Sequence, residues 1–552
     1  MNNASSLCRQ LRQREGVFIF IKKYNNRIKI IFTSFIIIFV FLIARLAALQ
    51  LMPSNEVIGS IDACQVENVN DTRFNLVDCT GKNILNFNEV YVLVIDKKPF
   101  SLNNYEETLQ DLLTLNFIMQ SEYKDFSYEN VMRCQGKCYY NISKEAYDKI
   151  NELKNIKGIY TYVYNKLDKS EAWSVCGMIT NMPEKYKISE DSFDDQVSKY
   201  INYNEEIKKS FSLDERSVYA KDKQEIIDNN DKIKLTIDEG IQEKIKSVLN
   251  REEYNNYHNI GVLLMESDTG KIRAMVQKDE TEANVNLCVE GMGYEPGSVY
   301  KLITLGAALE EGVISMNDTF LCKGKICKEG VHGRLSVKSA LVKSCNDVFA
   351  EIGEKVGYDK LMTYSERLGL FNPILNLKGE SRNEAEGVKP EKDSGMNNIS
   401  IGQCFTVSPI QVLGFTNAIV NNGIYIKPYI IDEILNCDDE IEESMSPKKE
   451  RVFSSTTSKL IKSAMNEVVE SGTGKRAQVG NVLIGGKTGS STGSNNTTHG
   501  WFSGYFICNK KTYTMTVFIP NISGKDKDGE DLGGGSTAAP IFSEVVKSLI
   551  NK

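Results

Sequence analysis

The chain has very little histidine: His258, His332 and His499 are the three in 552 residues. A serine enzyme of the Ser-His-Asp type needs a histidine beside its nucleophile. None of the three lies within ten positions of Ser298, the candidate nucleophile discussed below, so such a site would have to recruit a histidine from far along the chain. The shortage favours a different base, and lysine is the nearer candidate.

Excess positive charge is also missing. The formal net charge is −7, and residues 1–29 alone carry seven basic residues against one glutamate, so the rest of the chain carries −13. A chain of this sign does not present the basic surface that nucleic acid binding requires. Nucleic acid is therefore excluded as a partner, and internal repeats are absent as well.

The thirteen cysteines do not indicate a dense disulfide framework, because their number is odd and they are spread over both halves of the chain. Cys322, Cys327 and His332 are spaced closely enough to coordinate a soft metal, but their spacing matches no standard zinc pattern and a fourth ligand is not evident. A disulfide or free thiols are the favoured interpretation. We therefore expect no metal.

One long apolar run lies near the start of the chain. It is uncharged from Ile30 to Ala44, and with Arg45 as its sole break it continues to Met52, long enough at about 1.5 Å per residue to cross a bilayer. The basic residues 1–29 place the preceding end in the cytoplasm and everything after Met52 outside it. A cleaved signal peptide is the alternative, but the run exceeds a usual signal core and no clear cleavage site follows. We predict an uncleaved anchor.

A serine three residues ahead of a lysine supplies a nucleophile together with a base. The spacing occurs at Ser121/Lys124, Ser298/Lys301 and Ser446/Lys449. Only after Ser298 is the chain apolar on most faces, which predicts a buried helix. Side chains at i and i+3 share a helix face, and burial lowers the pKa of a lysine amine so that it can accept the serine proton. The alternative is a helix-capping serine with a lysine that extends to solvent.

Two further patterns follow in the chain. Ser344-Cys345-Asn346 falls between two helical patterns, at a joint where serine and asparagine also cap helix ends. Lys487-Thr488-Gly489-Ser490 follows the strand-like residues 482–484, and its alternative is a hairpin turn. Residues 501–506 and 513–519 read as two more strands, so we predict an antiparallel meander whose first strand carries the lysine and threonine.

Serine-x-x-lysine, serine-x-asparagine and lysine-threonine-glycine in this order are the signature of the penicillin-recognising serine enzymes. The chain closely resembles their class B, monofunctional penicillin-binding proteins over roughly residues 234 to 552. The resemblance implies an α+β fold: a transmembrane helix, an extended mixed pedestal domain, and a transpeptidase domain with an antiparallel sheet flanked by helices. The implied divisions are a cytoplasmic tail (1–29), the anchor (30–52), a pedestal or dimerisation-like domain (53–232) and the transpeptidase domain (233–552).

The chain departs from the family at Cys404, where glycine is common after the glycine-glutamine pair. This cysteine is expected to crowd the rim of the site. The pedestal region from about Pro99 to Lys232 shows only faint echoes of the family pattern.

The chemistry we infer is acyl transfer to peptidoglycan stem peptides. Ser298 attacks the penultimate D-alanine carbonyl, Lys301 takes its proton, and the terminal D-alanine leaves after reprotonation through Ser344 and Lys487. An amine from a neighbouring stem then resolves the ester. A β-lactam imitates the dipeptide, so it should acylate Ser298. No cofactor is required.

The family also implies binding roles. The backbone N–H groups of Ser298 and Ser490 would form the oxyanion hole, and Asn346 would hold the substrate amide. The Thr488-Gly489-Ser490 segment would bind the substrate, with the Thr488 and Ser490 side chains on its terminal carboxylate.

Other functions remain open. A D,D-carboxypeptidase would hydrolyse the ester instead of cross-linking it, and a serine β-lactamase would hydrolyse the drug. A protein of another class would be a wall-synthesis scaffold whose catalytic domain merely binds partners. A bifunctional enzyme is disfavoured because no Glu-Asp-x-x-Phe signature of a glycosyltransferase occurs. The expected partners are stem peptides, β-lactams, a membrane glycosyltransferase and the wall-synthesis complex, at the outer face of a bacterial cytoplasmic membrane.

Overall fold

The computed structural model describes the chain with several gaps. The described residues are 30–46, 64–153, 155–171, 173–180, 204–212, 219, 225–289, 291–327, 330–377, 383–526, 529 and 531–550. Residues 30–46 are helical, whereas the predicted cytoplasmic tail and residues 47–52 of the predicted anchor lie outside the described residues. Among the residues described, no helix combines the length and the apolar character needed to cross a membrane. The predicted transmembrane helix is therefore not shown.

The chain divides into two compact units. The first comprises Met1–Glu67, Tyr91–Tyr162 and Lys209–Ile226, and the second comprises Asn68–Val90, Val163–Lys208 and Ile227–Lys552. Each unit thus gathers separate stretches of sequence.

The first unit is built around a three-stranded sheet in the order β4-β3-β5. Its strands are β3 (Phe87–Asp96), β4 (Lys137–Ile142) and β5 (Ile159–Leu167), and its helices are α3 (Lys97–Asn103), α4 (Leu109–Glu122), α5 (Tyr128–Arg133) and α6 (Lys144–Glu152). Leu93, Leu115 and Ile150 belong to one buried cluster that joins sheet and helices. A second sheet pairs β1 (Cys64–Asn68), β6 (Lys208–Ser212) and β7 (Glu225–Ile227).

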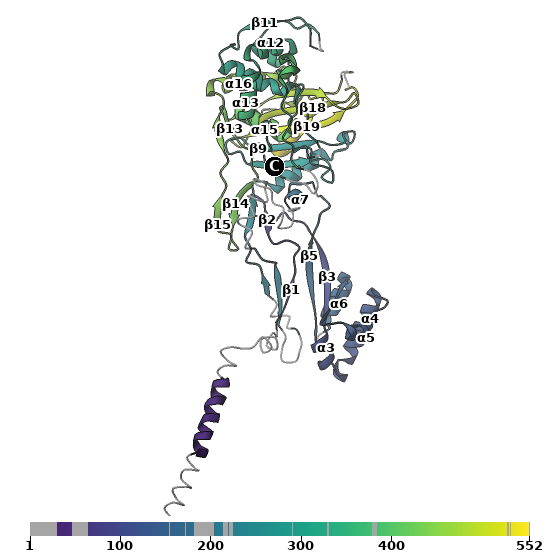
Figure 1. Ribbon diagram of the computed structural model, residues 1–552. Helices are drawn as coiled ribbons and strands as arrows, with labels where there is room; N and C mark the ends of the chain where they lie inside the picture. Colours follow the sequence, from purple (N-terminus) through teal and green to yellow (C-terminus); the bar gives the residue numbers. More distant parts are fainter. Residues whose placement is uncertain are drawn as a thin grey trace, which may run out of the picture. The chain divides into compact units, whose positions relative to one another are not determined.

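The second unit contains a five-stranded antiparallel sheet in the order β10-β9-β19-β18-β17. The strands are β9 (Gly261–Glu266), β10 (Ile272–Gln277), β17 (Ile484–Thr492), β18 (Thr498–Cys508) and β19 (Lys511–Ile522). Consecutive pairing of β17, β18 and β19 confirms the predicted meander, with Lys487 opposite Ser503. Figure 1 shows this sheet with helices gathered against it.

Helices cover both faces of the five-stranded sheet, so its strands are apolar on both sides. Trp501 faces one buried cluster, and its neighbour Phe502 faces another. Helices α9 (Glu239–Leu249) and α17 (Ala538–Ile550) pack in the Phe502 cluster. The Trp501 cluster holds α10 (Lys301–Glu310), α11 (Val337–Val342), α12 (Asn346–Val356), α13 (Tyr358–Arg367), α15 (Pro409–Val420) and α16 (Ser455–Glu470). The predicted α+β architecture of sheet and flanking helices is confirmed.

Smaller elements complete the second unit. They are the sheet of β2 (Asn75–Val77), β8 (Lys232–Leu235), β14 (Ile431–Leu435) and β15 (Ile441–Ser444), the pairs β11 (Thr319–Cys322) with β12 (Gly333–Ser336) and β13 (Ile424–Ile426) with β16 (Lys449–Arg451), and helices α7 (Val175–Thr180) and α14 (Met396–Ile399).

A buried carboxylate secures the loop that follows α13. The Glu384 carboxylate accepts backbone N–H bonds from Ile374 at 2.8 Å and from Leu375 at 3.0 Å. Burial nevertheless dominates and raises the pKa of Glu384 from 4.5 to about 7. The loop is therefore held by a group that titrates near neutral pH.

This pKa predicts a pH-dependent stability. Because the folded-state pKa is raised, the stabilising contribution of Glu384 is fully present below about pH 4.5 and is lost as the pH rises through about 7. The loss amounts to about 3 kcal/mol. We expect the Tm of the wild-type protein to fall through this contribution as the pH rises from 5 to 8. The Tm of the Glu384→Gln variant, whose side chain does not titrate, should not show this fall. Identical pH profiles of Tm for the two proteins would contradict the assignment.

Candidate active site

Ser298 and Lys301 lie on one short turn at the start of a buried helix. Ser298 belongs to the 3₁₀ turn η4 (Gly297–Tyr300), and Lys301 is the first residue of α10. Side chains three residues apart eclipse in a 3₁₀ helix, so the two share one side of the turn. Lys301 is fully buried and Ser298 is half-buried. The predicted buried helix after Ser298 is present.

Glycines allow this turn to lie against the edge strand. Gly297 has a φ of +54°, and a Cβ on it would lie 2.5 Å from the backbone oxygen of Ser490 on β17. Its amide donates to Gly402 O at 2.9 Å. A side chain at position 297 would therefore separate Ser298 from the Lys487-Thr488-Gly489 segment.

The Lys301 amine reaches the joint between α11 and α12, where the second motif was predicted. It donates to Ser344 O at 2.6 Å, to Asn346 Oδ1 at 2.6 Å and to Ser344 Oγ at 3.2 Å. Ser344 has a φ of +57°, a conformation that non-glycine residues adopt at a cost. This backbone turn directs both the carbonyl and the hydroxyl of Ser344 to one lysine.

A second buried amine approaches the same hydroxyl. Lys487 Nζ donates to Ser344 Oγ at 3.0 Å and to Thr488 O at 2.9 Å. Both lysine side chains are fully buried. The Ser344 hydroxyl thus bridges the amines of the first and third motifs, which lie far apart in sequence.

The third motif is held from behind by residues that the sequence analysis missed. Thr488 Oγ1 lies 2.6 Å from Thr473 Oγ1, and the Gly534 amide donates to Ser490 Oγ at 3.1 Å. A Cβ on Gly534 would lie 2.2 Å from Trp501 O. The glycine run 533–535 was the available sequence signal, because consecutive glycines often mark close backbone approach. Ser490 is exposed, so its hydroxyl remains accessible.

Glu295 ties the nucleophile turn to the sheet. Its backbone oxygen accepts from Ser491 Oγ at 2.6 Å and from Trp501 Nε1 at 3.1 Å, and its carboxylate accepts the Cys404 amide at 2.8 Å. Burial raises the pKa of this carboxyl. Cys404 is exposed with a φ of +68°, a backbone conformation that favours glycine.

His499, on β18, is buried and is engaged by the neighbouring strand β19. Burial lowers its pKa to about 4, and its Nδ1 accepts the Asn521 amide at 3.1 Å. The remaining serine-x-x-lysine pairs lie on other elements: Ser121 lies within α4, and Ser446 lies between β15 and β16. Lys301 directly follows the turn that bears Ser298, and its role as the base stays a prediction.

The thiol cluster requires a correction. The sequence analysis found no fourth ligand for Cys322, Cys327 and His332, but Cys345 joins them, and the ligand atoms of all four lie within 4.8 Å of one another. All three cysteines are free, so the disulfide considered for Cys322 and Cys327 is absent from the structure. These four residues form a candidate metal centre directly beside the second motif.

Gly534 offers a test of the close packing behind β17. In a Gly534→Ala variant the new methyl group would lie 2.2 Å from Trp501 O and 2.3 Å from Gly489 O, both backbone atoms. We expect a loss of about 1–3 kcal/mol in the free energy of unfolding, seen as a lower Tm. Gly291→Ala is the matched control, because nothing lies within 4 Å of its Cβ position. Equal Tm values for the two variants would refute the packing.

Comparison with known proteins agrees with this geometry. Residues 260–547 match the model of the penicillin binding protein transpeptidase domain. The chain is 31% identical over 358 residues to Stage V sporulation protein D of Bacillus subtilis. The aligned region covers 58% of this chain and 53% of that protein. The chain spans about half the length of the curated relatives it matches first.

Two solved structures share the fold at low identity. A peptidoglycan synthetase from Bifidobacterium adolescentis has a TM-score of 0.61 at 18% identity, covering 88% of this chain and 96% of that one. Penicillin binding protein 3 from Mycobacterium tuberculosis, complexed with ampicillin, has a TM-score of 0.57 at 18% identity, covering 88% of this chain and 95% of that one. Because the family model covers more than half of the sequence, the chain belongs to the penicillin-binding protein transpeptidase family, as the three motifs predicted.

Proposed function

We propose that the protein is a membrane-anchored D,D-transpeptidase that cross-links peptidoglycan stem peptides through an ester on Ser298. One observation carries the proposal: the buried amines of Lys301 and Lys487 both donate to Ser344 Oγ, at 3.2 and 3.0 Å, beside the turn that bears Ser298. Two basic groups linked by one hydroxyl can move protons in both directions, as acyl transfer requires.

In the acylation step the Ser298 oxygen bonds to the penultimate D-alanine carbonyl carbon, and its proton passes to the Lys301 amine. Ser344 O and Asn346 Oδ1, each 2.6 Å from that amine, then stabilise the resulting ammonium. The step requires a neutral Lys301 amine beforehand, with its lone pair free to take the proton.

The leaving D-alanine nitrogen needs a proton when the peptide bond breaks. Ser344 Oγ donates its proton and is reprotonated by a neighbouring lysine amine, Lys487 at 3.0 Å or Lys301 at 3.2 Å. The amine of a second stem peptide then attacks the ester carbonyl, loses a proton by the reverse route, and releases Ser298.

The substrate would lie along β17. The exposed Ser490 hydroxyl and the Thr488 hydroxyl bind the terminal carboxylate, with Gly489 between them leaving room for the peptide backbone. The backbone N–H groups of Ser298 and Ser490 form the oxyanion hole, where removal of one donor typically costs about 10²–10³ in rate. The close approach of Gly297 to Ser490 O supports this pairing. Asn346 holds the substrate amide.

We further propose a single N-terminal anchor over residues 30–52 with the catalytic part outside the cytoplasm. The apolar run and the basic residues 1–29 support this orientation. Residues 53–232 would serve as a pedestal and 233–552 as the catalytic domain, working with a membrane glycosyltransferase. The name of the Bacillus subtilis relative supports a setting in sporulation.

Covalent trapping by a β-lactam tests the nucleophile. We expect intact-mass spectrometry to show one penicillin adduct on the wild-type protein and none on Ser298→Ala or Lys301→Ala. Ser121→Ala and Ser446→Ala remove the serine of the two other serine-x-x-lysine pairs, and both should carry the adduct as the wild type does. An adduct on Ser298→Ala would end the assignment of this residue.

Product analysis separates the transpeptidase from its alternatives. With a stem pentapeptide and an added acceptor amine we expect the amide product to exceed the hydrolysed tetrapeptide. Hydrolysed peptide as the main product would indicate a carboxypeptidase, and rapid turnover of a fluorescent penicillin would indicate a β-lactamase. The Ser298→Ala variant, which lacks the nucleophile, sets the background in each assay.

A further inference from the structure

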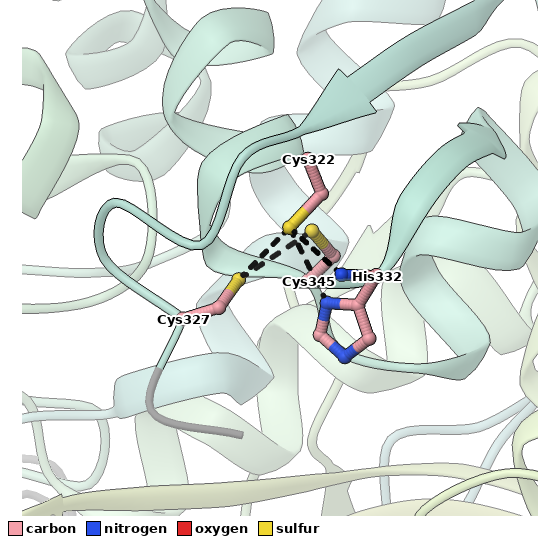
Figure 2. Close-up of side chains that lie close together, drawn as sticks. All are labelled: Cys322, Cys327, His332 and Cys345. Carbon is pink, nitrogen blue, oxygen red and sulfur yellow. Dashed lines mark hydrogen bonds between the residues drawn. The ribbon is translucent and has the colours of Figure 1, made fainter. Parts of the chain in front are cut away.

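Four metal-ligating side chains converge beside the active site. Cys322 ends β11, Cys327 lies in the following loop, His332 precedes β12, and Cys345 lies in the second motif between α11 and α12. Figure 2 shows their sulfur atoms and the imidazole directed at one point. The three cysteines are buried, Cys345 completely, whereas His332 is partly exposed. The three sulfur ligands are thus shielded from solvent, and solvent reaches the cluster at His332.

Three of the distances between these atoms fit the edges of a tetrahedron around one ion, and all four ligand atoms lie within 4.8 Å of one another. Cys322 Sγ lies 3.7 Å from Cys327 Sγ and 3.5 Å from His332 Nδ1, and Cys327 Sγ lies 3.6 Å from Cys345 Sγ. Zinc–sulfur bonds of about 2.3 Å and a zinc–nitrogen bond of about 2.0–2.1 Å at tetrahedral angles give edges of about 3.8 and about 3.5 Å. A disulfide would need about 2.05 Å between sulfur atoms.

Backbone amides provide a second layer of support. The His332 amide lies 3.4 Å from Cys322 Sγ, and the Asp347 amide lies 3.5 Å from Cys327 Sγ, each as a donor. Such hydrogen bonds orient the ligands and favour thiolate, the form that binds metal. Three thiolates and one imidazole in tetrahedral array are a known structural ligand set for Zn²⁺ and leave no open position for substrate.

We propose that Cys322, Cys327, His332 and Cys345 form a structural Zn²⁺ site that positions Ser344 and Asn346 of the catalytic motif. This proposal replaces the sequence-based expectation of no metal. Of the four ligands only Cys345 lies within the three catalytic motifs, and the metal-binding part of the proposal is independent of the proposed reaction.

The loop between Cys322 and Cys327 contacts the residues of the second motif and of the α12 start directly. The Asp347 carboxylate accepts the amides of Ile326 at 2.8 Å, Lys323 at 2.9 Å and Lys325 at 3.0 Å. Asn346 donates to Ile326 O at 3.2 Å while its Oδ1 accepts from Lys301 at 2.6 Å. This loop therefore contacts Asn346, and Asn346 in turn accepts a hydrogen bond from Lys301, the proposed base.

Cys345 also connects the cluster to the second motif through the backbone, because it lies between Ser344 and Asn346. Ser344 holds a φ of +57°, and Cys345 is the N-cap of α12 without a capping side-chain hydrogen bond. A zinc ion bound to Cys345 Sγ would hold this turn in place. Ser344 and Asn346 would then keep their positions around Lys301 without relying on the helix cap.

Metal analysis of the full-length protein tests the site. We expect one zinc per chain by plasma mass spectrometry, and less than about a tenth of that in Cys322→Ser and Cys327→Ser, because each variant loses one of four ligands. Cys288→Ser, at an equally buried thiol outside the cluster, should keep its zinc. Zinc absent from the wild-type protein after reconstitution, or retained in both cluster variants, would overturn the proposal.

A pair of histidine variants tests the positioning role, which rests on the proposed acylation of Ser298. His332→Ala should lose zinc and acylate with a fluorescent penicillin at least about tenfold more slowly, the scale seen when support of a site is removed. His332→Cys keeps four ligands, so it should retain zinc and the wild-type acylation rate. Circular dichroism checks that both variants are folded.

The outcomes distinguish the two proposals. A zinc-free, folded His332→Ala variant that acylates as fast as the wild type would overturn the positioning role. Failure of the wild type itself to acylate would refute the proposed function, while the zinc measurement would still decide the metal site.

Discussion

The active site depends on one hydroxyl held between two buried amines. Ser344 Oγ accepts from Lys301 and from Lys487, and neither lysine side chain is exposed to solvent. Two ammonium groups at this separation would repel each other and lose their hydration, so burying both together is costly. Acceptors limit the remaining cost: Ser344 O and Asn346 Oδ1 serve one amine, and Thr488 O serves the other.

This constraint explains why the surrounding packing is so close. The nucleophile turn, the α11–α12 joint and β17 must meet within hydrogen-bond distance of a single oxygen atom. Glycine makes that approach possible: added Cβ atoms on Gly297 and Gly402 would lie 2.5 Å from Ser490 O and 2.1 Å from Gly297 O. Behind β17, Gly534 meets Trp501 O and Gly489 O in the same way. Backbone contact, rather than long side chains, therefore sets the positions of the motifs.

Much of this site could be predicted from the sequence, because its signals are local. Ser298 stands three residues ahead of Lys301, where a strongly apolar helix begins, and the meander of β17, β18 and β19 follows from consecutive strand patterns. Thr473 could not be found this way, since it reaches the third motif only through tertiary contact, and the glycine run 533–535 signals close packing without naming the strand that Gly534 meets. The N-terminal region gave a clear apolar pattern, but the described residues include no membrane-crossing helix.

Cys345 shows most clearly where sequence reasoning stopped. Cys345 lies within Ser344-Cys345-Asn346 at a helix joint, and 12 or more residues separate it from each other ligand of the cluster, in contrast to the short ligand pairs of common zinc motifs. Only folding of β11 and β12 against α12 places its sulfur 3.6 Å from that of Cys327. A serine with a positive φ, such as Ser344, normally needs its surroundings to hold that backbone conformation. At this joint Cys345 makes no side-chain capping hydrogen bond, so a zinc ion bound to its sulfur would be the support for Ser344.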